Sequence, residues 1–548
     1  MSEQITVADA VGRAIALAGA AHAFGVVGSG NFRMTNALIE SGVGFTATRH
    51  EMGAACAADA YSRLSGRVAV VSVHQGGGFM NAMTGVIEAA KANSRVVVLA
   101  GDVARGDTTS NFAIDQDRAA EAVGAIPARV QSARSAITDA ARAVHTAAAS
   151  RRPVVLSVPV DIQDELIDWD PSLVPAAPVL IPAGASPESI ARLVELLAAA
   201  ERPVVIGGRG AHGAKAELRE LGAAAGALLI ASAAGRGIFV GEEWALDVMG
   251  GFATPGAADL VAEADLLVAF GASLNKWTAR GGVLTQGKRI VQVDDRPSAI
   301  GAHRPVELAI IGDAALVAAA AAEALRGRFP EGRVGYRTPE AHARVQRSRY
   351  WSEQPVESRA TERHVDPAEL SVALDRLLPI ERVVVPDGGN VNAYGGAFYR
   401  VPDEQGYVID LASQSIGLGL ACGIGAAVAR PDRLTVVPTG DGSFLMNLVE
   451  LDTALRLGIG LLVVVYNDSA YGAEVHIFHD DPRQGIVRFP DTDIAAIARG
   501  YGCEAITVRS LDDLAPLPAW LAGPRDRPFV IDAKIEGYPS PVMALDMH

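Results

Sequence analysis

The chain has 548 residues, of which 49% are hydrophobic and 20% charged, so it is a globular protein rather than a disordered one, and its length favours three domains. A net charge of −15 with no basic tract excludes nucleic acid as a partner, because binding phosphates requires a basic face. The few, widely spaced cysteines suit a reducing cytoplasm and form no metal-binding pattern: Cys56, Cys422 and Cys503.

Apolar strands alternate with alanine-rich helices along the chain. The first predicted helix begins near Thr6, which together with Asp9 resembles a capping box, and no apolar run is long enough for a membrane span. We therefore expect neither a signal peptide nor a membrane partner. Strands are predicted over residues 68–73, 95–99, 154–158, 203–206, 266–270, 290–293, 382–385, 434–439 and 461–466. Strands that are apolar throughout and separated by helices indicate an α/β chain with doubly wound parallel sheets.

Two stretches are predicted to be linkers. Residues 168–187 contain five prolines, and residues 326–366 are polar, charged and poor in apolar periodicity. They divide the chain into three expected domains, over residues 1–168, 188–326 and 366–548. Each of these thirds is expected to hold one doubly wound parallel sheet.

Two acidic residues follow neighbouring predicted strands in the last third. The strand at 434–439 leads into Gly440-Asp441-Gly442-Ser443 and an amphipathic helix, and the next strand ends just before Asp468. In such a βαβ unit both acids lie at carboxyl ends of strands, where open α/β sheets bind ligands. Two carboxylates there can share a hard cation, and the amides of Gly442 and Ser443 can receive a phosphate.

Each of these short motifs alone is an ordinary turn or cap, but the ordered set indicates a metal and diphosphate site. With this set the sequence resembles the thiamin diphosphate enzymes of the acetohydroxyacid synthase, pyruvate decarboxylase and benzoylformate decarboxylase superfamily. The resemblance implies thiamin diphosphate and Mg²⁺ as cofactors, with Asp441, Asp468 and the carbonyl of Ala470 as metal ligands. Asp468 stands where the family usually has asparagine, and it adds a negative charge beside the diphosphate.

The resemblance extends to two segments upstream of this unit. The motif Asp387-Gly388-Gly389-Asn390 matches a second loop that contacts the diphosphate, which implies that Gly389 and Asn390 bind the cofactor. Gln414-Ser415-Ile416-Gly417 matches the segment that holds the pyrimidine ring. Within it, Gln414 would contact the cofactor and Ile416 would be the apolar wedge that bends it. The alternative for Ile416 is an ordinary core residue.

Glu51 is a candidate catalytic residue near the start of the chain. In Thr48-Arg49-His50-Glu51 a predicted strand runs into a helix of small residues. In the family that the sequence resembles, a glutamate at this point hydrogen-bonds the pyrimidine nitrogen N1′ and promotes loss of the proton from the thiazolium ring. Because Thr48 and Glu51 are three residues apart, the alternative is a capping box at the start of the helix.

Three further residues match catalytic positions of similar enzymes. His74 and Ser29 align with the active-site histidine and serine of enzymes resembling benzoylformate decarboxylase. Glu474 lies 33 residues after Asp441, the offset of an active-site glutamate in enzymes resembling pyruvate decarboxylase. The alternatives are a solvated loop histidine and an exposed helix glutamate.

The middle third shows weaker signs of a nucleotide site. A predicted strand leads into Gly207-Gly208-Arg209-Gly210, and another ends in Asp294-Asp295, the arrangement of a phosphate turn and a ribose-binding acid. In the family, this domain binds FAD in some members, ADP in others and nothing in many. The sequence leaves all three alternatives open.

The resemblance implies an enzyme that acts on a small 2-oxo acid or acyl substrate, as a decarboxylase or an acetolactate synthase-like carboligase. It also implies a homodimer or homotetramer, because the cofactor lies between domains of two subunits. One alternative is a 2-hydroxyacyl-CoA or acyloin lyase of the benzaldehyde lyase type; the absence of a basic segment after residue 537 counts against the acyl-CoA form. Another is a non-catalytic subunit, which would have no need to keep both Glu51 and Asp441.

Overall fold

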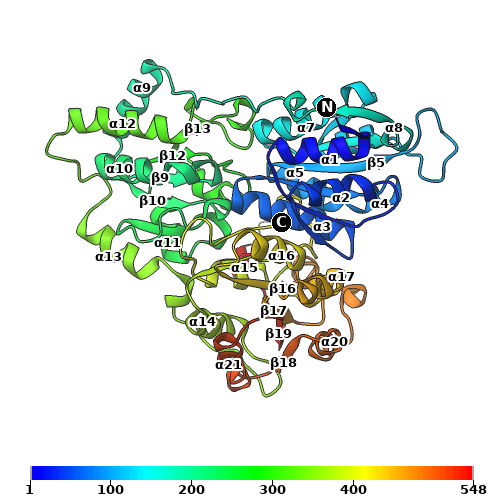
Figure 1. The fold of residues 1–548 in the computed structure, drawn as a ribbon. Helices are drawn as coiled ribbons and strands as arrows, with labels where there is room; N and C mark the ends of the chain where they lie inside the picture. Colours follow the sequence, from blue (N-terminus) through cyan, green and yellow to red (C-terminus); the bar gives the residue numbers. More distant parts are fainter. Residues whose placement is uncertain (1–2, 546–548) are drawn as a thin grey trace.

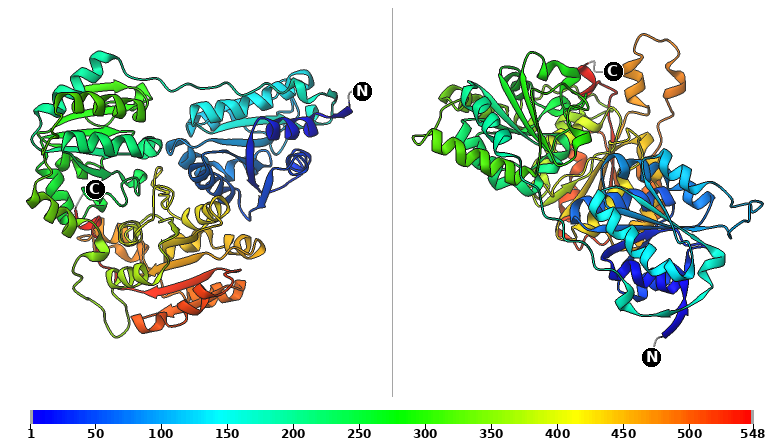
Figure 2. Two further views of the ribbon diagram at one scale, coloured as in Figure 1. Left: turned by 60° about the vertical axis from the view of Figure 1, so that its left-hand side comes forward. Right: turned by 90° about the horizontal axis from the view of Figure 1, so that it is seen from above.

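The computed structural model describes residues 3–545 and contains three parallel sheets of five or six strands (Figures 1 and 2). Each sheet forms one lobe, and the lobes follow one another along the chain: N-terminal (blue to cyan), middle (green) and C-terminal (yellow to red). This confirms the expected three-domain α/β fold. Residues 1–2 and 546–548 of the expected outer domains lie outside the described residues. No described helix is both long and apolar enough to cross a membrane.

The N-terminal lobe has a parallel sheet of order β3-β2-β4-β5-β7-β6. Its strands are β2 (Ala20–Gly25), β3 (Gly44–Ala47), β4 (Val68–Val73), β5 (Val96–Asp102), β6 (Ile126–Arg129) and β7 (Val154–Pro159). Its helices are α1 (Val7–Leu17), α2 (Phe32–Glu40), α3 (Glu51–Ser65), α4 (Gly77–Asn81), α5 (Met83–Lys91), α6 (Gln116–Ala122), α7 (Ala136–Ser150) and α8 (Val160–Gln163). A short antiparallel ribbon of β1 (Glu3–Thr6) and β8 (Leu166–Trp169) closes the lobe.

The middle lobe has a parallel sheet of order β11-β10-β9-β12-β13-β14. Its strands are β9 (Pro203–Gly207), β10 (Leu228–Ala231), β11 (Ala245–Val248), β12 (Leu266–Phe270), β13 (Arg289–Asp294) and β14 (Leu308–Ile311). Its helices are α9 (Pro187–Ala199), α10 (Lys215–Ala225), α11 (Pro255–Ala262), α12 (Ala314–Arg328) and α13 (Pro339–Ser348). Helix α13 lies inside the predicted linker 326–366 and packs Ala341 and Val345 into the core of this lobe.

The C-terminal lobe has a parallel sheet of order β15-β16-β17-β19-β18. Its strands are β15 (Arg382–Val384), β16 (Leu434–Gly440), β17 (Leu462–Asn467), β18 (Glu504–Val508) and β19 (Phe529–Lys534). Its helices are α14 (Pro367–Leu377), α15 (Asn392–Phe398), α16 (Gly419–Ala429), α17 (Asp441–Asn447), α18 (Glu450–Arg456), α19 (Gly472–Ile477), α20 (Ile494–Tyr501) and α21 (Leu517–Ala522). The single amphipathic helix predicted after Asp441 is therefore divided into α17 and α18.

Helices α3 and α16 join the N-terminal and C-terminal lobes. Cys56 and Ala60 of α3 share a hydrophobic core with Cys422 of α16. The helices come so close that a Cβ on Gly425 would lie 2.0 Å from the carbonyl oxygen of Ala57. Only small residues permit this approach, so the small-residue sequence of α3 fixes the position of one lobe on the other.

Candidate active site

The two predicted metal ligands lie at adjacent strand ends. Strands β16 and β17 pair in parallel, with Gly440 opposite Tyr466, so Asp441 and Asp468 follow at the same edge of the sheet. Asp441 is only 5% exposed. Burial raises the pKa of Asp441 to about 7, with the negative charge of Asp468 adding to the shift, and burial raises the pKa of Asp468 to about 6. Burial makes the charged form of both carboxylates unfavourable, and a bound cation would offset this cost. The pair therefore fits a metal site.

A metal ion at this edge of the sheet would need further ligands besides the carboxylates of Asp441 and Asp468. Among the described residues, no cluster of three or more His, Cys, Asp or Glu side chains could hold a metal. Ala470 is buried, and Ser469 before it has a left-handed backbone, with φ of 54°. Hydrogen bonds to residues 487–489 use the Ser469 carbonyl and the Tyr471 amide, whereas no hydrogen bond within the described chain occupies the Ala470 carbonyl. This carbonyl therefore fits the predicted third ligand.

Two positions beside the two acids have room only for glycine. A Cβ on Gly442 would lie 2.5 Å from the Tyr471 ring, and one on Gly472 would lie 2.7 Å from an Asp468 carboxylate oxygen. Any side chain at either position would therefore clash with these neighbours. Ser443, which follows Gly442 in α17, is buried beneath this edge of the sheet.

The predicted diphosphate loop lies after β15. Gly389 has a positive φ of 95°, and no heavy atom lies within 4 Å of the place where its Cβ would be, so its backbone faces open space. The Asn390 side chain is used within the chain: its amide donates to the Tyr538 carbonyl at 2.8 Å and its oxygen accepts from the Ser540 amide at 2.9 Å. Asn390 thus holds the segment 538–540 beside the loop.

Gln414 and Ile416 lie in an irregular segment, residues 411–416, which we call the holding loop. Gln414 is exposed, has a left-handed backbone and donates its side-chain amide to the Leu411 carbonyl at 2.7 Å. Ile416 is only half-buried and belongs to none of the hydrophobic cores, so it is not an ordinary core residue. A Cβ on Gly388 would lie 2.8 Å from the Ile416 side chain, which places the two predicted cofactor segments in contact.

Glu51 is the first residue of α3 and does not form a capping box. The cap is His50, whose Nδ1 accepts from the Met52 amide, while the Thr48 hydroxyl donates to the His50 carbonyl. The Glu51 carboxylate instead accepts from Asn81 of α4 at 3.0 Å. The Glu51 carboxylate therefore lies at the start of α3 without being used as its cap.

The start of α3 is held by an acid from the other lobe, which the sequence analysis missed. Glu450 of α18 is fully buried and accepts from the backbone amides of Arg49 and His50 at 3.0–3.3 Å and from the Thr453 hydroxyl. It fixes the residues directly before Glu51. An acid between the apolar Leu448 and Leu451 is the only sequence signal for this role.

His74 and Ser29 lie near Glu51. His74 follows β4, and its Nδ1 accepts from the Gly30 amide at 3.2 Å, which leaves Nε2 as the proton-bearing nitrogen. A Cβ on Gly78 would lie 3.1 Å from His74 and 3.2 Å from Glu51, so the two side chains flank the same glycine. Ser29 is exposed in the turn before Gly30. We call Ser29, Glu51 and His74 the N-terminal group. They follow β2, β3 and β4, respectively, at one edge of the sheet.

Glu474 lies on α19 and is exposed, without a side-chain hydrogen bond in the described chain. His476, two residues on, is half-buried, and burial lowers its pKa. The chain by itself therefore does not provide the enclosure expected around Glu474. We refer to the predicted site residues of the C-terminal lobe as the C-terminal group: Gly389, Asn390, Gln414, Ile416, Asp441, Gly442, Ser443, Asp468, Ala470 and Glu474.

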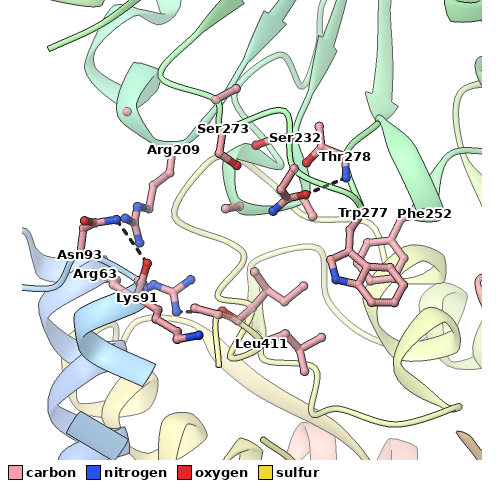
Figure 3. A pocket seen from close by; sticks show the side chains of 18 of the residues that line it. Arg63, Lys91, Asn93, Arg209, Ser232, Phe252, Ser273, Trp277, Thr278 and Leu411 are labelled. Carbon is pink, nitrogen blue, oxygen red and sulfur yellow. Dashed lines mark hydrogen bonds between the residues drawn. The ribbon is translucent and has the colours of Figure 1, made fainter. Parts of the chain in front are cut away.

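A cavity of about 670 Å³ lies between the three lobes. Gly389, Asn390 and Gln414 of the C-terminal group line it, whereas none of the N-terminal group does. Figure 3 shows Arg209 pointing into one side of the cavity together with basic residues of the N-terminal lobe, with aromatic side chains opposite. The basic residues labelled there are Arg63, Lys91 and Arg209, and the aromatic ones are Phe252 and Trp277.

The middle lobe contributes its predicted nucleotide motif to this cavity. Arg209 follows β9 and has no hydrogen bond or ion pair in the described chain; burial lowers its pKa to about 9, as do the charges of neighbouring arginines. At the end of β13, Asp295 pairs with Arg151 of the N-terminal lobe at 2.6 Å, whereas Asp294 accepts from the Arg296 amide at 3.0 Å and lies 3.7 Å from the Arg296 guanidinium. Both acids line the cavity. The cavity therefore combines an unpaired cation with an acid at a strand end.

Comparison with known families shows which family the chain belongs to. The model of the thiamine pyrophosphate enzyme N-terminal TPP binding domain matches residues 5–121, that of the central domain matches 190–321, and that of the C-terminal TPP binding domain matches 387–533. The chain belongs to the thiamin diphosphate enzymes. The first of these models spans the whole N-terminal group and the third spans the whole C-terminal group of this thiamin diphosphate enzyme.

Curated relatives match nearly the full chain. A protein named 2-ketoarginine decarboxylase from Pseudomonas aeruginosa is 28% identical over 528 residues, covering 93% of this chain and 90% of its own. An acetolactate synthase large subunit from Parasynechococcus marenigrum is 28% identical, covering 89% and 80%. A thiamine pyrophosphate-containing protein from Bacillus subtilis is 26% identical, covering 90% and 85%. This thiamin diphosphate enzyme is thus similar to proteins named for different reactions.

Proposed function

We propose that the chain is a thiamin diphosphate- and Mg²⁺-dependent enzyme that cleaves or forms a carbon–carbon bond next to the carbonyl of a 2-oxo acid. The observation that carries the proposal is the placement of Asp441, Asp468 and the free Ala470 carbonyl at neighbouring strand ends. The names of two relatives, a 2-ketoarginine decarboxylase and an acetolactate synthase, support a 2-oxo acid substrate.

The C-terminal group would hold the cofactor. Asp441, Asp468 and the Ala470 carbonyl offer three oxygen ligands to Mg²⁺, which prefers oxygen and leaves room for diphosphate oxygens. Gly389 and Gly442 are the points at which the backbone can come close to the diphosphate, because neither carries a side chain. When bound, thiamin diphosphate supplies a carbon nucleophile and an electron sink.

The N-terminal group would handle protons. Glu51 can share a proton with a pyrimidine nitrogen because its carboxylate is not used as a helix cap. His74 can donate from Nε2, since its Nδ1 is occupied by the Gly30 amide. Ser29 offers a hydroxyl to a substrate at the same edge, and Glu474 is a second acid on the C-terminal side.

A second copy of the chain would complete the site. No hydrogen bond in the described chain joins a side chain of the N-terminal group to one of the C-terminal group, and the central cavity reaches only the latter. Both groups have exposed apolar neighbours, which are Val27, Phe32, Met80 and Phe112 on one side and Met446, Ile477, Phe478 and Ile486 on the other. Contact between these surfaces of two copies would bury both. Light scattering should show a dimer or tetramer; a monomer that turns over substrate would contradict the shared site.

The cavity between the lobes would bind an adenine nucleotide, FAD or ADP. The unpaired Arg209 suits a phosphate and Asp294 suits a ribose hydroxyl. A flavin absorbance in the purified protein, or a thermal shift with ADP that is lost in Arg209→Gln, would support occupancy. If the protein shows neither the flavin absorbance nor the thermal shift with ADP, the middle domain is an empty spacer.

The function is tested by binding and by products. Circular dichroism and calorimetry with thiamin diphosphate and Mg²⁺ should show saturable binding, which a non-catalytic subunit without the cofactor would lack. A product screen with pyruvate, benzoylformate, 2-ketoarginine and a hydroxyacyl-CoA then separates the reactions. Release of carbon dioxide from an oxo acid supports the proposal, whereas cleavage of the hydroxyacyl-CoA alone would replace it with the lyase alternative.

A further inference from the structure

The holding loop is fastened to the N-terminal lobe by one acidic side chain. Glu88 lies on α5 and is fully buried. One of its carboxylate oxygens accepts from the Ala412 amide at 2.8 Å, and the other accepts from the Ser413 amide at 2.7 Å and the Ser413 hydroxyl at 2.6 Å. Three donors of the loop therefore converge on one buried carboxyl group.

The other end of the holding loop is fastened within the C-terminal lobe. Asp387 is buried and accepts from the amides of Gly417 and Gly419 at 3.0 and 3.1 Å. It also accepts from the Thr439 hydroxyl, next to the strand end that carries the predicted metal site. Residues 414–416 therefore span the distance between two anchors that belong to different lobes.

A second contact from the N-terminal lobe keeps the approach to the loop in place. Arg63 of α3 donates to the Ile409 carbonyl at 2.8 Å and to Asp59 on the same helix at 3.2 Å. Burial raises the pKa of the neighbouring Asp410 well above its usual value. Glu88 is thus the side chain of the N-terminal lobe that accepts the hydrogen bonds of the loop itself.

We propose that Glu88 is a positioning residue that sets the holding loop, and with it Gln414 and Ile416, in the geometry that receives the pyrimidine side of thiamin diphosphate. The proposal rests on the proposed function, because it needs that cofactor at the C-terminal group. It assigns to the N-terminal lobe a role in shaping the cofactor site of its own C-terminal lobe, 324 residues away along the chain.

The chemistry of the contact predicts a specific loss in Glu88→Gln. Glutamine keeps the shape but offers one oxygen in place of two, and its amide group would face donors of the loop. At least one buried donor then loses its acceptor, which is the costly outcome for a hydrogen bond. The loop should move or become mobile, while Asp441 and Asp468, which Glu88 does not touch, should keep their positions.

The experiment compares two ligands and one structural readout in the full-length chain. Calorimetry with Mg²⁺ present should show that Glu88→Gln binds thiamin diphosphate about 10–100-fold more weakly than the wild type but binds inorganic pyrophosphate equally well. Hydrogen exchange should show loss of protection at the amides of residues 412 and 413 without any cofactor. Ser413→Ala, which removes only one of the three hydrogen bonds, should give a smaller change in the same direction.

Asp375→Asn is the matched control. Asp375 is also a buried acid, and it accepts from the Arg400 amide and side chain at 2.8 Å, away from the holding loop. The Asp375→Asn substitution should lower stability without changing the ratio of the affinities for thiamin diphosphate and inorganic pyrophosphate. If Glu88→Gln does not fold, the same ratio measured for Ser413→Ala tests the inference.

The outcomes separate the two claims. A wild-type chain that binds pyrophosphate but not thiamin diphosphate would overturn the proposed function and the inference with it. A wild type that binds thiamin diphosphate, with Glu88→Gln or Ser413→Ala binding it equally well, would overturn the inference alone. Equal weakening of both ligands would also overturn it, because it would indicate a general loss of structure.

Discussion

Replacing Asp441 by asparagine should have opposite effects on the empty chain and on cofactor binding. In the empty chain, burial and the charge of Asp468 raise the pKa of Asp441 from 3.8 to about 7. At 1.36 kcal/mol for each tenfold change in acidity, keeping this group charged at pH 8 costs the folded chain about 4 kcal/mol. Because Asp468 shares the repulsion and asparagine loses some polar contacts, we expect the variant to be more stable by about 1–3 kcal/mol.

The pH dependence gives the sign of the effect. A folded-state pKa above the unfolded value means that the folded chain binds more protons between about pH 4 and pH 7, so the stability of the wild type should fall as the pH rises through this window. Asp441→Asn removes this part of the slope. Its gain in stability should therefore be present at pH 8 and nearly absent at pH 4.

Thermal unfolding of the metal-free proteins at pH 5 and pH 8 is the assay, with about 2–4 °C expected for each kcal/mol in a domain of this size. Adding Mg²⁺ and thiamin diphosphate at about 100 times the dissociation constant should stabilise the wild type by about 2.7 kcal/mol, and Asp441→Asn by far less. A variant that is less stable than the wild type at both pH values and binds the cofactor normally would refute the assignment of Asp441 as a buried metal ligand.

Three further predictions concern proton transfer and the cavity. Glu51→Gln should leave the fold and cofactor binding largely intact but slow exchange of the thiazolium C2 proton, measured by NMR, because glutamine cannot share a proton with N1′; wild-type exchange would contradict this. Glu474→Gln should lower turnover by about 10²–10⁴-fold, with a cofactor adduct accumulating after acid quench; near-normal turnover would show that Glu474 is only an exposed surface residue. Arg209→Gln should weaken ADP binding by about tenfold in calorimetry at low salt, since a charge-assisted hydrogen bond is lost; unchanged affinity would place the phosphates elsewhere.

Much of the fold could be predicted because parallel strands carry their own signal. The strand at 266–270 is found at the expected residues, since five consecutive apolar residues are needed where helices cover both faces of a sheet. The four-residue strand β14 was missed, because an apolar run that short cannot be told from part of a helix. Helix α13 was missed for a related reason: its polar sequence is helical mainly because its buried face packs on the middle lobe.

The sequence by itself determined the list of candidate site residues: the acids after two adjacent strands, the glycine turns and the glutamate before a small-residue helix. These signals are local, since each needs only a strand end and the residues that follow it. Only the tertiary structure decided what those residues are free to do. Whether Glu51 caps its helix depends on His50, Asn81 and the distant Glu450, and the placement of the holding loop depends on Glu88 from another lobe. The hydrogen bonds of Glu450 and Glu88 join residues more than 300 positions apart, and no spacing along the chain encodes them.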